Sequence, residues 1–145
     1  MTTAAEAEER CANLIVLCGR LGAMLAEETA AFEGRRPQDI IASQPETQRL
    51  ANLYRHESAK IRAQPGLVAP ASAATRRQVL AAVQSFEGVL ARHGRAVAAA
   101  QEISAGIVQA IAAEVAAQRN SVSPYGPKAK AGSATNTAIA LNKRA

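Results

Sequence analysis

Cysteine and histidine are the side chains with which this chain could do chemistry, and the sequence holds two of each. Cys11 and Cys18 are seven residues apart, so on one helix they share a face but lie about 10 Å apart along the axis. A disulfide cannot span that distance, and no CxxC pattern or neighbouring histidine provides the spacing of a metal site. We expect two small buried thiols in a reducing compartment, with a disulfide to another chain or a metal site as the alternative.

The histidines and acids do not form the pattern of an active site. His56 falls on an expected helix surface, whereas His93 falls on an apolar seam, where a buried polar residue can set helix register. A ligand-binding or pH-sensing role for His93 is the alternative. Asp39 is the single aspartate, and the glycines do not form a phosphate-binding loop. We therefore predict that the protein is not an enzyme and has no catalytic residues, metal ligands or cofactor.

The elements that position these side chains are predicted to be helices. The chain has 145 residues, of which 48% are hydrophobic, only 3% are aromatic and none is Trp, while about a quarter are alanine. Sheet cores are usually filled with aromatic and β-branched side chains, so this composition favours an all-α protein. The length suits one domain.

The basic charge is concentrated at the C-terminus. The net charge is +5, and Lys128, Lys130, Lys143 and Arg144 contribute four of these charges with no acid among them. Proteins that bind nucleic acid usually gather lysine and arginine on one face of their folded part. We therefore expect no nucleic-acid partner, although a basic-tailed protein that contacts phosphates is a third hypothesis.

Neither a membrane span nor a secretory signal is expected. The longest uninterrupted apolar runs, among them Leu14 to Cys18, are far shorter than the roughly 20 residues that cross a bilayer. The N-terminus carries Glu6, Glu8 and Glu9, where a secretory signal needs basic residues. These features predict a cytoplasmic protein.

Apolar spacing predicts three helices, at about residues 3–33, 37–63 and 72–119. In the first, Glu28 interrupts the apolar stripe, and Gly34 is expected to form a left-handed C-cap. In the second, Pro45 either kinks the helix or delays its start. The third keeps two heptad series, Val79, Phe86, His93, Ala100, Ile107 and Val83, Leu90, Val97, Ser104, Ile111.

Short links make neighbouring helices antiparallel. The sequence therefore predicts an elongated, antiparallel, three-helix coiled-coil-like bundle with a very long third helix. In this arrangement residues 1–120 form the helical domain, and residues 121–145 form a flexible basic arm.

The two shorter helices are expected to reach along the third helix only to about Val97. Beyond it lies an apolar stripe formed by Ile103, Ile107, Val108, Ile111 and Val115. Such a stripe usually marks an interaction surface, so we expect a partner protein to bind it. An offset between the first and third helices, or a homodimer formed through the stripe, is the alternative. In the arm, Tyr125 lies between Pro124 and Pro127 and could dock on a partner or fold back on the third helix.

The sequence resembles the FlgN-type flagellar export chaperones, particularly their alphaproteobacterial branch. The resemblance covers nearly the whole chain. It is carried by the end of the first helix, the break after it, one stretch of the second helix and two short motifs near the C-terminus: Leu21, Met24, Leu25, Glu27, Glu28; Arg36-Pro37; residues 48–54 (QRLANLY); Tyr125-Gly126-Pro127; Ala140-Leu141-Asn142.

This resemblance implies a cytosolic helical chaperone of flagellar type III secretion. Such a chaperone binds hook-associated proteins of the hook–filament junction and delivers them to the export gate at the membrane. By position, the resemblance assigns client binding to the stripe from Ile103 to Val115 and gate docking to Tyr125. Some relatives regulate flagellin synthesis, so a regulator without an export role, or a coiled-coil adaptor or homodimer, is the alternative.

Overall fold

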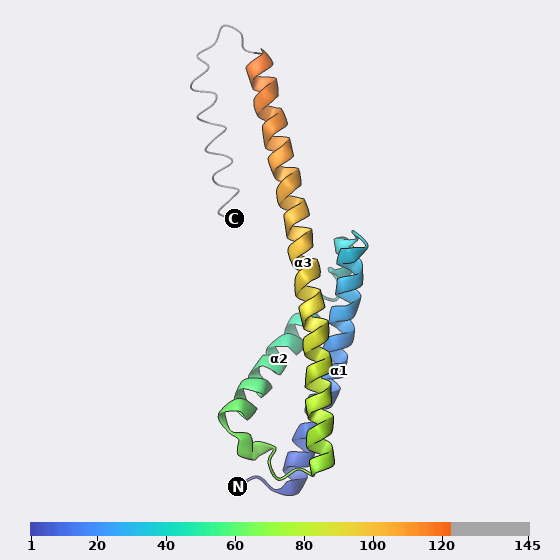
Figure 1. Ribbon diagram of the computed structural model, residues 1–145, viewed down its shortest axis with the longest axis vertical. Coiled ribbons are helices and arrows are strands. Elements are labelled where there is room, and N and C mark those ends of the chain that lie inside the picture. Colours follow the sequence, from blue (N-terminus) through green and yellow to red (C-terminus); the bar gives the residue numbers. More distant parts are fainter. Residues whose placement is uncertain (123–145) are drawn as a thin grey trace. The chain divides into compact units, whose positions relative to one another are not determined.

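The computed structural model describes residues 1–122, and this part of the chain is all-α (Figure 1). Its helices are α1 (Ala4–Glu33), α2 (Gln44–Ala63) and α3 (Ala73–Val122), with the short 3₁₀ helices η1 (Pro37–Ile40) and η2 (Pro65–Leu67) in the links. The predicted all-α fold with a very long third helix is confirmed. The chain divides into a first unit, Met1–Ala98, and a second unit that begins at Ala99, so α3 contributes residues to both.

Both ends of α1 are closed by local hydrogen bonds. At its start, the Thr3 hydroxyl accepts from the Glu6 N–H, and the Glu6 carboxylate accepts from the Thr3 N–H, which is a capping box. At its end, Arg36 N–H donates to Ala31 and Arg35 N–H donates to Phe32, the pattern of a Schellman motif.

The left-handed residue of this C-terminal motif is Arg35, with φ of 58°, and not Gly34, whose φ is −82°. The prediction for Gly34 was therefore wrong. The helix ends at Glu33, as expected, but the Gly34 N–H still donates to Ala30, which moves the left-handed position onto the next residue. A side chain there costs roughly 1 kcal/mol relative to glycine.

The second predicted helix is shorter than expected. Residues 37–40 form η1, residues 41–43 are turns, and α2 begins only at Gln44. Pro45 lies in the first turn of α2, where a missing N–H costs no helical hydrogen bond. Of the two outcomes considered for Pro45, a delayed start is the one observed.

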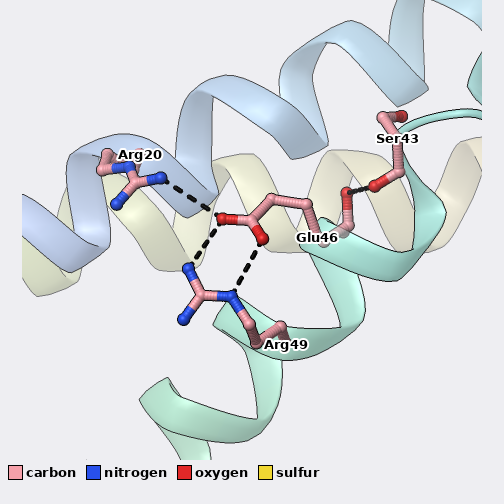
Figure 2. A network of polar contacts seen from close by, with 5 residues as sticks. Arg20, Ser43, Glu46 and Arg49 are labelled. Atoms are coloured by element: carbon pink, nitrogen blue, oxygen red, sulfur yellow. Dashed lines mark hydrogen bonds and ion pairs between the residues drawn. The ribbon is translucent and has the colours of Figure 1, made fainter.

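Ion pairs show that α2 runs antiparallel to α1. Arg10 near the start of α1 lies 3.1 Å from Glu57 near the end of α2, and Arg20 lies 3.3 Å from Glu46 near the start of α2. Glu46 also accepts two hydrogen bonds from Arg49, so one carboxylate joins both helices (Figure 2). These hydrogen bonds lower the pKa of Glu46.

Polar contacts at both ends show that α3 runs parallel to α1 within the first unit. Near the start of α3, Glu8 of α1 accepts from the Ser72 N–H and from the Thr75 hydroxyl, the latter at 2.6 Å. Near the end of α1, Glu33 accepts two hydrogen bonds from Arg92, at 2.9 and 3.0 Å. The donors lower the pKa of both glutamates. Short links thus place α2 antiparallel to both of its neighbours.

The core of the first unit lies between these helices. α1 supplies most of it, and α2 and α3 each add one fully buried residue: Leu14, Leu17, Cys18, Leu21, Leu25, Leu50 and Phe86. The Tyr54 ring packs on that of Phe86 with centroids 4.5 Å apart. The apolar stripe predicted for the first helix therefore forms the centre of the fold.

The cysteines belong to this packing. Cys11 and Cys18 are free and buried, as the sequence predicted. Burial raises the pKa of both thiols, which keeps them protonated and weakly reactive near neutral pH.

One position of the predicted heptad seam is wrong. Leu90 is 45% exposed, whereas Val89 packs against the core. The 3.6-residue helix repeat brings either neighbour close to the seam, and contacts with α1 and α2 select Val89.

Candidate functional site

The predicted client-binding stripe lies on the part of α3 that belongs to the second unit. All five of its side chains are exposed: Ile103 by 52%, Ile107 by 55%, Val108 by 43%, Ile111 by 59% and Val115 by 41%. Exposure of this many large β-branched side chains is costly in water and typical of a binding surface.

Helix geometry places these residues on one side of α3. Ile103, Ile107, Ile111 and Val115 follow one another at intervals of four residues, which in an α-helix gives a continuous ridge that turns slowly around the axis. Gln109 comes two residues after Ile107 and so lies on the opposite side, since each residue turns the helix by about 100°. The stripe is therefore an apolar side of a helix segment whose other residues are mostly small or polar.

Few charged or metal-binding groups lie near the stripe. Glu102, Glu114 and Arg119 are the charged residues between Ala99 and Asn120. Within residues 1–122, no group of three or more histidine, cysteine, aspartate or glutamate side chains is arranged to hold a metal ion. What this surface can do is pack against another apolar surface.

α3 is also long and apolar enough, by length and composition, to cross a membrane, and none of the qualifying stretch is buried. The prediction that no segment crosses a membrane was based on uninterrupted apolar runs alone. Over a longer window, alanine, isoleucine and valine outweigh the scattered polar residues. Glu102 and Glu114 lie along this part of the helix, and a carboxylate in the hydrocarbon core is costly.

A second feature, which the sequence did not identify as a site, is an open cleft of about 520 Å³ in the first unit. All three helices line it, and Glu28, Gln44 and His93 lie together in its wall. The signal available in the sequence was Glu28 itself, an acid within the apolar stripe of the first helix. Its pairing with His93 depends on how α1 and α3 pack.

The structure also places the two histidines. His56 is exposed on α2, as expected. His93 is partly buried, with its ring 6.2 Å from the Phe32 ring in an edge-on arrangement and its Nε2 atom 3.8 Å from Glu28 Oε1. Tyr125 and the basic arm lie outside the described residues, so the docking role of Tyr125 stays a prediction.

Comparison with known proteins adds the biological setting. No protein-family model and no solved structure matches the sequence. The flagellar basal-body protein FlbY of Caulobacter vibrioides is 42% identical to it over 149 aligned residues, which span 98% of this chain and 97% of that protein. Because this identity extends over essentially the full length of both chains, the protein belongs to the family of the flagellar basal-body protein FlbY.

Proposed function

We propose that this protein is a cytoplasmic export chaperone that binds hook-associated flagellar proteins and delivers them to the export gate. Membership of the FlbY family supports a flagellar role. The resemblance to FlgN-type chaperones supports the chaperone class. The observation that carries the proposal is the exposed stripe from Ile103 to Val115, because a chaperone of this kind needs an apolar surface free to receive a client.

The stripe suits a client that presents an amphipathic helix. Its main ridge repeats every four residues over three turns, which matches the spacing of the apolar side of a second helix. Packing two such sides together removes apolar area from water on both partners, at about 25 cal/mol per Å². A client helix that would otherwise aggregate is thereby kept soluble until export.

The decisive experiment introduces a charge into the stripe. Ile107→Asp and Ile111→Asp each force a carboxylate into the client interface and should weaken binding of hook-associated proteins by several kcal/mol. Gln109→Asp adds the same charge on the opposite side of α3 and should leave binding unchanged. Co-purification with untagged hook-associated proteins measures the effect, circular dichroism checks folding, and swimming assays report the outcome in cells.

Three results would contradict the proposal. The first is wild-type protein that captures no hook-associated protein. The second is a homodimer, detected by light scattering, that the Ile→Asp variants dissociate, since the stripe would then be a self-interface. The third is flotation of the wild-type protein with lipid vesicles that the same variants abolish, since α3 would then be a membrane element.

A further inference from the structure

The cleft in the first unit has a polar end, where two buried polar atoms have no hydrogen-bond partner within the described residues. Its walls are largely apolar, with Leu21 and Leu25 from α1, Tyr54 from α2, and Phe86 and Leu90 from α3. Leu90 is the apolar side chain that the predicted seam placed in the core and that the structure leaves 45% exposed. The volume of about 520 Å³ lies in the usual range of ligand pockets.

Glu28 forms the polar end of the cleft and is only 4% exposed. Its Oε1 atom accepts a hydrogen bond from the Gln44 amide and lies 3.8 Å from His93 Nε2. Its Oε2 atom and His93 Nε2 are both buried and have no hydrogen-bond partner within the described part of the chain. A buried carboxylate oxygen without a donor is costly, and a ligand that supplies a donor removes that cost.

We propose that this cleft binds a lysine or arginine side chain of a partner protein, with the Glu28 carboxylate as its counter-charge. A basic side chain has an apolar stem and a charged tip, which matches apolar walls that end in a carboxylate. A purely apolar ligand would leave Glu28 Oε2 unsatisfied, and at this end of the cleft the Glu28 carboxylate would repel an anion. Arginine fits best because its planar guanidinium can donate two parallel hydrogen bonds to one carboxylate.

The basic residues of α2 do not already fill this position. Arg55 and Arg62 also line the cleft, but Arg55 donates to Asn52 at 3.2 Å. Gln44, the donor to Glu28, is eleven residues before Arg55, or about 16 Å along the helix. These arginines therefore belong to the far end of the cleft.

Gln44 already donates to Glu28 Oε1. It therefore competes with an incoming cation for the carboxylate. This gives two substitutions with opposite expected effects. Gln44→Ala removes the competing donor and should strengthen binding, whereas Glu28→Gln removes the charge and should weaken it.

The test titrates the full-length protein with pentylguanidinium, which mimics the arginine side chain, and with pentylurea, its neutral counterpart. NMR follows the resonances of the His93 ring and the Glu28 amide. We expect pentylguanidinium to shift both resonances saturably and to bind about tenfold more tightly than pentylurea. Glu28→Gln should remove this preference, and Gln44→Ala should increase the affinity for pentylguanidinium severalfold. Circular dichroism checks the folding of each variant.

Equal affinity for the two probes in the wild-type protein would overturn the proposal even if Glu28→Gln failed to fold. So would shifts confined to exposed acids such as Glu6 and Glu9. If pentylguanidinium binds only after Lys143 and Arg144 are both changed to Gln, the occupant is a segment of the chain itself, and the proposal of an external partner is wrong. The stripe on α3 is not part of this site, so the Ile107→Asp variant should bind pentylguanidinium normally.

Discussion

The two halves of α3 both carry apolar residues at helical spacing, but these residues have different surroundings. In the first unit, Phe86 is 4% exposed, and Val79 and Val89 pack with it against α1 and α2. In the second unit, Ile107 and Ile111 are each more than half exposed, although they follow the same helical spacing. The comparison teaches that periodicity defines which side of a helix is apolar, whereas only neighbouring elements determine whether that side becomes a core or a binding surface.

The polar contacts make the same distinction. In the first unit, α3 is fixed to α1 near both ends of α1, through Glu8 at the start and Glu33 at the end. These contacts set the register in which Phe86 enters the core. The stripe of the second unit consists of apolar side chains, so under the proposed function its selectivity for a client must come from shape and spacing.

The largest expected contrast is in stability. Leu21 is 1% exposed at the centre of the core, so Leu21→Ala should lower the free energy of unfolding by about 2–5 kcal/mol through lost contacts and a cavity. Ile107→Ala removes a side chain of similar size from the second unit and should change this free energy by no more than about 0.5 kcal/mol. Urea unfolding followed by circular dichroism measures both. A comparable loss for Ile107→Ala would show that the stripe is part of the protein's own core or of a dimer.

Thiol labelling gives a second contrast. Cys11 and Cys18 are buried with raised pKa values, so a thiol reagent should modify them only when the first unit opens. Ser104→Cys places a thiol at an exposed position of the second unit. We expect the native cysteines to react at least about a hundredfold more slowly than the introduced one at pH 7.5. Mass spectrometry resolves the sites, and equal rates would contradict the burial of the native pair.

The smallest expected effect is a dependence of stability on pH. Hydrogen bonds from Ser72 and Thr75 lower the pKa of Glu8, and those from Arg92 lower that of Glu33. The stabilisation they provide is complete above the ordinary glutamate pKa of about 4.3 and is lost as the pH falls through the lowered values. Thermal melts between pH 3 and 7 should therefore show a falling midpoint below about pH 4.3. Glu8→Gln should flatten this decline, whereas Glu102→Gln in the second unit should not.

Local rules predicted the helices well where the signals were strong and failed where two choices were nearly equal. The stripe of α1, the stop before Pro37 and the long α3 all follow from spacing and from residue type. The predictions of a left-handed Gly34 and a buried Leu90 were wrong, and the start of α2 was left open between two alternatives. Each of these depends on a shift of one residue or a few, which costs little locally and is decided by contacts with other helices.

The sequence by itself determined that the chain is helical, that it has three main helices, and that the second half of α3 carries an apolar stripe. These properties depend on alanine content, apolar period and the positions of proline, all of which act over a few residues. The tertiary structure alone brought Glu28 of α1, Gln44 of α2 and His93 of α3 together. Nothing in their sequence separation predicts this meeting, because it requires the parallel packing of α1 with α3 and the late start of α2, and both are set by the packing of the bundle.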